Sequence, residues 1–363
     1  MPASLVRLFW DCNPSQFPFE RTKTMKKVRI AMIGFGGIAR THYAGYTDLA
    51  TRNVPFELVA ICDIDKAQFE KQITINTSAE PVKIAESIHT YTNLDEMLAN
   101  EEFDMADICL PTYLHCEYTT KMLRAGKHVL CEKPMALNSL QCEEMLAVAK
   151  ETGKKLMIGQ CLRFSDAYRY VKKCIDEKTF GELENLNMYR LSAHPEWGFE
   201  NWFQDDTRSG GCILDMHIHD IDMARYLLGE PTSVSVTAYN GQTRWQVENT
   251  RLFYPNLTVV ADGSWNEGRK SPFSAGLRAR FEKAQVVMQG YAVKVYPNEG
   301  DPFVPDIPVC RPFTEEFAFF IDLLLNDKEN LENPPESAYK TVKLVELLRE
   351  SADNGAVTLP INY

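Results

Sequence analysis

Three residues in two separate stretches have side chains that could move a proton to or from a hydroxyl group: Lys133, Asp215 and His219. Lys133 lies in HVLCEKPM (128–135), where an apolar run ends on a Glu-Lys-Pro triplet. Asp215 and His219 lie in GGCILDMHIHDID (210–222), and on one continuous helix they would share a face with Asp222. An imidazole titrates near ~6.5, whereas a lysine at ~10.4 needs a lowered pKa to act as a base near neutrality.

Both stretches also allow simpler interpretations. A charged residue followed by proline often ends a strand, because proline has no N–H to donate. His219 could equally be a hydrogen-bonded core residue of a capped helix. A metal site made of His217, His219, Asp215 and Asp222 is disfavoured, since residues two apart on a helix point in different directions. Neither stretch by itself decides between structure and catalysis.

A glycine-rich turn supplies a second kind of chemistry. Residues 34–39 read GFGGIA, which fits G-x-G-x-x-A, between an apolar run and a helical pattern. Such a turn lets the backbone approach a pyrophosphate at a helix N-terminus. Asp63 ends the next apolar run, close to the spacing expected of the acid that binds a ribose 2′-hydroxyl. Its carboxylate would repel a 2′-phosphate and Lys66 is the nearest cation along the chain, so we expect NAD(H) rather than NADP(H).

The elements that must position these residues alternate regularly. Strand-like runs at 28–33, 57–62, 89–91, 106–110, 128–131 and 155–159 are separated by helical patterns. This alternation predicts a parallel, doubly wound sheet, a Rossmann domain over residues 26–160. Ligands of such sheets bind at the carboxyl ends of the strands. The glycine turn, Asp63 and Lys133 are all predicted at that edge.

The pattern changes after residue 160. We expect helices at 166–178 and 211–228, antiparallel strands between 231 and 297, and closing helices near 314–326 and 336–352. The fold class is therefore α/β for the first domain, followed at 161–363 by an α+β domain with an open, mainly antiparallel sheet. An open apolar sheet face would favour a homodimer or homotetramer through this sheet. Residues 1–25 contain three prolines and no helical or strand period, so we expect a flexible leader.

Composition excludes several classes of protein. The 363 residues carry a net charge of −11, which argues against nucleic acid or an anionic membrane surface as a partner. No uncharged apolar run approaches the ~20 residues that a membrane span requires. The 10 cysteines include no C-x-x-C pair, which suits a reducing compartment and disfavours zinc or disulfides. We expect a cytoplasmic protein.

Taken together, the motifs resemble the Gfo/Idh/MocA family of oxidoreductases. GFGGIARTH, ICDID, LPTYLH, HVLCEKPMALN and GGCILDMHIHDIDMARYLLG occur in that family's order and spacing. The resemblance covers about residues 26–363. It implies an NAD(P)-dependent dehydrogenase acting on the CH–OH group of a sugar, sugar derivative or cyclitol, with no metal.

The resemblance also assigns roles to individual residues. It implies a catalytic trio of Lys133, Asp215 and His219. We expect His219, oriented by Asp215, to take the proton while Lys133 donates a hydrogen bond to the substrate oxygen; the reverse choice of base stays open. The cofactor would contact Gly34, Phe35, Gly36, Gly37, Ile38, Asp63, Pro111, Thr112, His115, Glu132 and Lys133.

The substrate side of the site follows less directly from the sequence. The resemblance implies that Arg163 faces the substrate, beside Lys133, Asp215 and His219. Type and spacing alone add Trp202, Tyr189, His194 and Trp197, of which the tryptophans could equally be core residues. Three alternatives share the fold: a non-enzymatic nucleotide sensor, a redox-assisted NAD-dependent glycoside hydrolase and a trans-dihydrodiol dehydrogenase. The retained Lys133, Asp215 and His219 count against the sensor.

Overall fold

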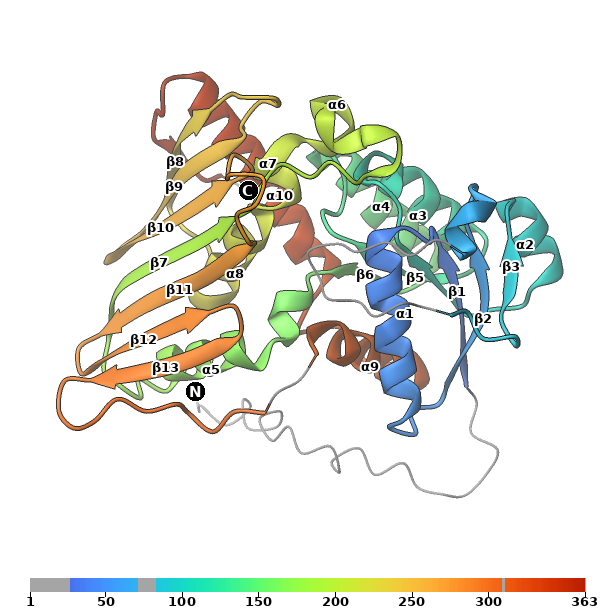
Figure 1. Cartoon of the computed structure of the whole chain (residues 1–363), viewed down its shortest axis with the longest axis horizontal. Helices are drawn as coiled ribbons and strands as arrows, with labels where there is room; N and C mark the ends of the chain where they lie inside the picture. The colour runs from blue at the N-terminus through green and yellow to red at the C-terminus, as the bar shows by residue number, and fades with distance from the viewer. Residues whose placement is uncertain (1–26, 71–82, 309–310, 363) are drawn as a thin grey trace.

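The computed structural model describes residues 27–70, 83–308 and 311–362 (Figure 1). The leader predicted at 1–25 lies outside these residues. Two sheets face each other across a layer of helices, and the two sheets come from successive parts of the chain. The predicted fold class is confirmed for both parts.

The first sheet has six parallel strands in the order β3-β2-β1-β4-β5-β6. Its strands β1, β4 and β5 lie at the centre, are mainly apolar and are almost wholly buried, as parallel strands covered by helices must be. The elements are β1 (Val28–Ile33), α1 (Gly37–Ala50), β2 (Phe56–Cys62), β3 (His89–Tyr91), α2 (Leu94–Asn100), β4 (Met105–Ile108), α3 (His115–Arg124), β5 (His128–Glu132), α4 (Ser139–Thr152) and β6 (Leu156–Gly159).

The second sheet has eight strands in the order β13-β12-β11-β7-β10-β9-β8-β14. Its pairs are antiparallel except for β7 with β10. The elements are α5 (Asp166–Asp176), β7 (Leu183–Leu191), α6 (Asp206–Ser209), α7 (Gly211–Asp215), α8 (Ile218–Leu228), β8 (Ser233–Tyr239), β9 (Val247–Tyr254), β10 (Leu257–Ser264), β11 (Ser274–Phe281), β12 (Ala284–Gln289), β13 (Ala292–Pro297), α9 (Pro312–Leu325), α10 (Pro335–Asp353) and β14 (Leu359–Pro360).

One helix from the end of the chain completes the first domain. Phe317, Phe320 and Ile321 of α9 are fully buried among side chains of α1 and β1. The helix therefore covers a face of the parallel sheet, although a division at residue 160 assigns it to the second domain. This face would otherwise expose a large apolar surface.

The predicted single helix at 211–228 is wrong, because it is broken between α7 and α8. The amides of Met216 and His217 both donate to the carbonyl of Cys212, which disrupts the regular ladder. His217 then lies beneath the helices, and its Nε2 is 2.9 Å from Thr250 Oγ1 on β9. Asp215 and His219 consequently stand on two helices rather than on one continuous face.

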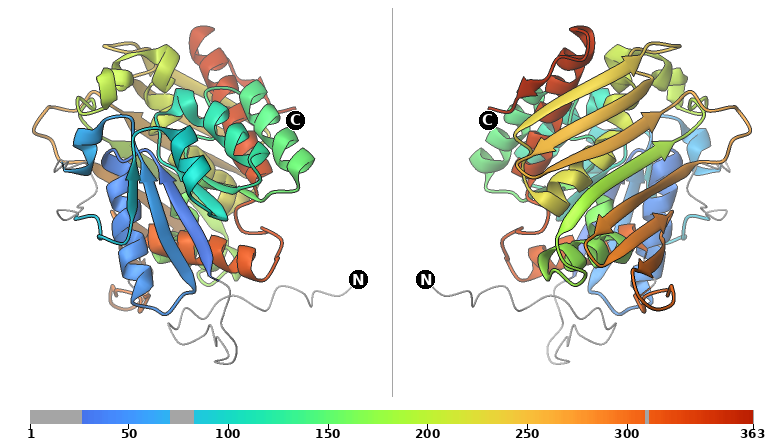
Figure 2. Two further views of the ribbon diagram at one scale, coloured as in Figure 1. Left: turned by 90° about the vertical axis from the view of Figure 1, so that its right-hand side faces the viewer. Right: turned by 90° about the vertical axis from the view of Figure 1, so that its left-hand side faces the viewer.

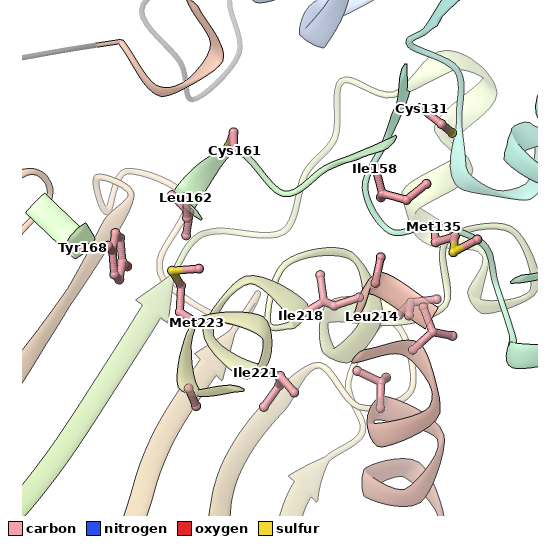
Figure 3. Packing of buried hydrophobic residues seen from close by; sticks show 14 of the residues in the cluster. Cys131, Met135, Ile158, Cys161, Leu162, Tyr168, Leu214, Ile218, Ile221 and Met223 are labelled. Carbon is pink, nitrogen blue, oxygen red and sulfur yellow. The ribbon is translucent and has the colours of Figure 1, made fainter. Parts of the chain in front are cut away.

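A continuous apolar core joins the two domains beneath the carboxyl ends of β5 and β6. Figure 3 shows Cys131 and Ile158 of these strands above Leu214 of α7 and Ile218 of α8, and all four belong to one buried cluster. All four side chains are fully buried. This shared packing fixes α7 and α8 relative to the end of β5, where Lys133 follows.

One face of the second sheet is covered by helices and the other is open (Figure 2, right). The exposed residues of its strands include Asn249, Arg251 and Arg278, so the open face is more polar than we expected. Association through this face stays a prediction. Among the described residues, none of the helices combines the length and apolarity needed to cross a membrane.

Candidate active site

A cleft of about 870 Å³ runs along the carboxyl ends of the parallel strands and is closed on its other side by the second domain. Thirteen of the predicted residues line it: Gly34, Gly36, Gly37, Ile38, Asp63, Pro111, Thr112, Glu132, Lys133, Trp197, Trp202, Asp215 and His219. These residues come from the glycine turn, the ends of β2, β4 and β5, and the segment from 197 to 219. The structure thus brings the stretch with Lys133 and the stretch with Asp215 and His219 together across one cavity.

The glycine turn leaves room where a ligand would approach. Gly34 has a φ of +90°, and a Cβ there would lie 2.6 Å from the carbonyl oxygen of Cys109, so only glycine fits. A Cβ on Gly36 would meet no atom of the described protein within 4 Å. Gly36 caps α1 without a side-chain hydrogen bond, which leaves the first amides of the helix for a bound anion.

Asp63 stabilises the same turn. Its Oδ2 accepts a hydrogen bond from the Phe35 amide at 2.7 Å, and its Oδ1 accepts one from Asp65 at 2.8 Å. Burial raises the pKa of Asp63, while these two amides and the charge of Arg40 lower it in part. The carboxylate lines the cleft and keeps lone pairs for further donors.

Two predicted cofactor contacts lie behind the cleft wall. The ring of Phe35 is buried against Tyr43 and Phe69, and only its neighbours line the cavity. The ring of His115 is bonded by Nδ1 to the Pro134 carbonyl and by Nε2 to the Leu110 carbonyl, at 2.7 and 2.8 Å. Both side chains therefore support the turn and the loop from behind the cleft wall, and contact of these two residues with the cofactor stays a prediction.

The break between α7 and α8 leaves the Asp215 carbonyl free to accept a hydrogen bond from Lys133. The His219 amide donates to the Met216 carbonyl at 3.3 Å rather than to the carbonyl of Asp215. Lys133 Nζ instead donates to the Asp215 carbonyl at 2.7 Å and lies 3.4 Å from Asp215 Oδ1. Asp215 therefore holds the lysine, where we expected it to orient His219.

His219 is partly buried and lines the cleft close to Lys133 and Arg190. Burial lowers the pKa of His219 well below 6.5, and the charges of Lys133 and Arg190 lower it further. Its Nδ1 has no hydrogen-bond partner among the described residues. The ring is therefore neutral at neutral pH and can accept a proton.

Arg163 is not among the residues that line the cleft, which corrects its predicted place beside the substrate. Its Nε and Nη2 donate to the two carboxylate oxygens of Asp222 at 2.8 and 2.7 Å, and Nη2 also donates to Ser337 Oγ. Both charged groups are buried. The pair ties the segment after β6 to α8, which gives Asp222 a structural role.

Replacing Arg163 by methionine is expected to lower the free energy of unfolding by about 3–5 kcal/mol, because Asp222 would keep a buried charge without its main partner. Urea denaturation of the purified protein measures this loss. Arg269→Gln is the matched control, since its partner Glu196 and Arg269 are both exposed. Equal stability of the two variants would contradict the structural role of Arg163.

Trp202 fits both interpretations of the sequence, because it lines the cleft and also stacks on Phe203 within an aromatic cluster. Trp197 also lines the cleft and is 42% exposed. His194 packs edge-on against Trp265, and its Nδ1 lies 3.2 Å from both the Pro195 carbonyl and Gln204 Nε2. Tyr189 is not among the lining residues.

Arg190 is the functional candidate that sequence reasoning missed. It lies on β7, lines the cleft and pairs through Nε and Nη2 with the buried Asp220 at 3.0 and 3.1 Å. Its sequence signal is the strand period, because residues 186, 188 and 190 share one face. A charged residue on the same strand face as the buried Leu186 and Met188 indicates a buried polar site.

The sequence matches two family models. One is described as "Oxidoreductase family, NAD-binding Rossmann fold" and spans residues 28–160, and the other, the "GFO/IDH/MocA C-terminal domain", spans residues 168–279. The chain belongs to the Gfo/Idh/MocA family. Its first domain accordingly has the NAD(P)-binding Rossmann fold of this family.

Two curated family members and one solved structure illustrate the range of relatives. Inositol 2-dehydrogenase of Rhizobium meliloti is 34% identical over 58% of this chain and 58% of its own length. D-glucoside 3-dehydrogenase of Escherichia coli is 32% identical over 60% of this chain and 59% of its own. The chain thus matches under two thirds of each. The WlbA dehydrogenase of Bordetella pertussis, solved with NADH and UDP-GlcNAcA, superposes with a TM-score of 0.74 at 20% identity, covering 93% of this chain and 100% of its own.

The residues present fit a dinucleotide. The open space at Gly36 and the uncapped start of α1 suit a pyrophosphate, and Asp63 offers a carboxylate to ribose hydroxyls. Pro111 and Thr112 line the wall between this turn and Lys133. These features are independent of the family match and agree with it.

Proposed function

We propose that this protein transfers a hydride between NAD(H) and a secondary hydroxyl of a sugar, sugar derivative or cyclitol. One observation carries the proposal most directly: a neutral histidine and a lysine held at 2.7 Å by a backbone carbonyl face the same cleft as the glycine turn. A dehydrogenase needs a proton acceptor and a hydrogen-bond donor at this place. The names of the two curated relatives, an inositol and a glucoside dehydrogenase, support the substrate class.

The nicotinamide cofactor would supply the hydride acceptor, and Gly36, Gly37, Asp63, Pro111, Thr112 and Glu132 would hold it. His219 takes the hydroxyl proton, since its imidazole is neutral and faces the cleft. Lys133 donates a hydrogen bond to the same oxygen and stabilises the charge that develops there. Asp215 fixes the ammonium group through its carbonyl and carboxylate.

The experiment that tests this proposal is a substrate panel. Purified protein with NAD is mixed with sugars, inositols, glycosides and sugar acids, and NADH formation is followed by absorbance. Steady production of NADH from polyhydroxy compounds supports a dehydrogenase. Hydrolysis of an aryl glycoside without net NADH would support the redox-assisted hydrolase, and tight NADH binding without turnover would support the sensor.

NADH is expected to bind at least about 10-fold more tightly than NADPH, because Asp63 accepts ribose hydroxyls and repels a 2′-phosphate. Arg40 is not expected to neutralise a 2′-phosphate, because it is not among the residues that line the cleft. Its guanidinium donates instead to the carbonyls of Phe35, Gly36 and Gln68. Fluorescence titration of both cofactors measures the ratio. Asp63→Asn should weaken NADH binding by about 10-fold, and tighter binding of NADPH by the unmodified protein would contradict the assignment.

A further inference from the structure

A buried hydrogen-bonded network lies directly behind Lys133. His42 of α1 stands between two acids of the parallel sheet, with Nδ1 2.9 Å from Asp107 Oδ2 and Nε2 2.8 Å from Glu132 Oε1. The other oxygen of Glu132 accepts the backbone amide of Lys133 at 3.0 Å. The imidazole is 0% exposed, and Glu132 is only 4% exposed.

The surroundings keep this network in one arrangement. Gly159 of β6 makes room for the Glu132 carboxylate, because a Cβ there would lie 3.0 Å from Oε1. The rings of Phe313 and Phe317 lie 5.4 and 4.8 Å from the imidazole of His42 and close it off from α9. Polar groups enclosed in this way cost free energy unless each has a partner, so the bonds fix the side chains.

Charge favours the same arrangement. Burial by itself lowers the pKa of His42, but the charge and hydrogen bonds of Asp107 and the nearby Cys109 outweigh it, so the pKa is raised well above 6.5. Burial raises the pKa of the neighbouring Glu316 well above 4.5, with a further contribution from Glu132. With its pKa raised, His42 is protonated and donates from both ring nitrogens, to Asp107 and to Glu132.

Lys133 is thus anchored at both ends. Asp215 of the second domain holds Nζ, and Glu132 holds the backbone amide from within the first domain. We infer that His42 is a positioning residue, which aims Lys133 into the cleft by fixing the Glu132 carboxylate. The inference rests on the proposed function, since it gives Lys133 a part in the reaction.

Two substitutions at one position separate positioning from mere stability. The amide nitrogen of glutamine can take the place of Nε2 and keep the bond to Glu132, while losing the bond to Asp107. Asparagine places its amide nearer Nδ1, so it keeps Asp107 and loses Glu132. His42→Gln should hold kcat within about 3-fold of the parent protein, whereas His42→Asn should lower it about 10- to 100-fold, as expected for a displaced reacting group.

Measurements besides turnover make the comparison decisive. The Kd for NADH should stay within about 3-fold in both variants, and crystal structures should show Lys133 Nζ displaced from the Asp215 carbonyl in His42→Asn only. Equal loss of kcat in the two variants, or an unmoved Lys133 in His42→Asn, would overturn the inference. If no compound is turned over by the parent protein, the proposed function fails while the lysine positions still decide this inference.

A second variant covers the case in which a change at position 42 prevents folding. Glu132→Gln is close in shape but keeps only one acceptor oxygen for the two donors, His42 Nε2 and the Lys133 amide. While the protonated His42 donates from Nε2, one of the two bonds must break, so a 10- to 100-fold loss of kcat is again expected, on the order found for misplaced reacting groups. Parent-like kcat and an unmoved Lys133 in this variant would overturn the inference.

Discussion

Lys133→Met is expected to reduce kcat by about 10³-fold or more, with the Kd for NADH changed less than about 3-fold. Methionine fills a similar volume but has no ammonium group, so the reacting oxygen loses the donor that Asp215 holds in place. The cofactor contacts at the glycine turn and Asp63 are untouched. Stopped-flow or steady-state NADH formation gives kcat, and fluorescence titration gives the Kd.

A second lysine provides the control for this substitution. Lys155 immediately precedes β6, at the edge of the sheet opposite the cleft, where its Nζ contacts Asp327 and the Lys328 carbonyl. Lys155→Met should leave kcat unchanged. A Lys133→Met protein that loses NADH binding together with turnover would point to a structural role and contradict the catalytic one.

His219→Asn is expected to lower kcat/KM by about 10²- to 10⁴-fold, the usual contribution of a general base. Asparagine cannot accept the hydroxyl proton at any accessible pH. The effect should be visible at saturating NAD and should leave the Kd for NADH nearly unchanged. His128→Asn is the control, because burial also lowers the pKa of His128, to about 4, but this residue begins β5 at the opposite edge.

The pH dependence of the parent protein tests the same assignment. A base must be neutral to act, and the neutral fraction of His219 falls only when the pH drops through its own pKa. Because burial lowers that pKa well below 6.5, kcat/KM should stay level from neutral pH down past 6.5 and decline at lower pH. Activity that instead climbs steadily through the alkaline range would assign the base to an amine, in agreement with the reverse assignment.

The sequence by itself determined the elements and the edge at which the site lies. The positions of the buried strands follow from local apolar runs in the sequence. Parallel strands have all their carboxyl ends at one edge of the sheet, and ligands bind there. The positions of the glycine turn, Asp63 and Lys133 at one cleft follow from this geometry alone. His219 was predicted at the same site from the family resemblance, because no local hydrophobic pattern places it there.

The tertiary structure decided the partners of these residues. Lys133 meets a residue 82 positions away, and His42 meets one 90 positions away. No local period encodes such contacts, because they depend on how α1, α7 and α8 pack against the sheet. The packing also broke the helix after Asp215, sent Arg163 into a buried ion pair and brought Arg190 to the cleft. Polar groups enclosed by packing must find partners inside the protein, so the final fold rather than the sequence pattern assigned them.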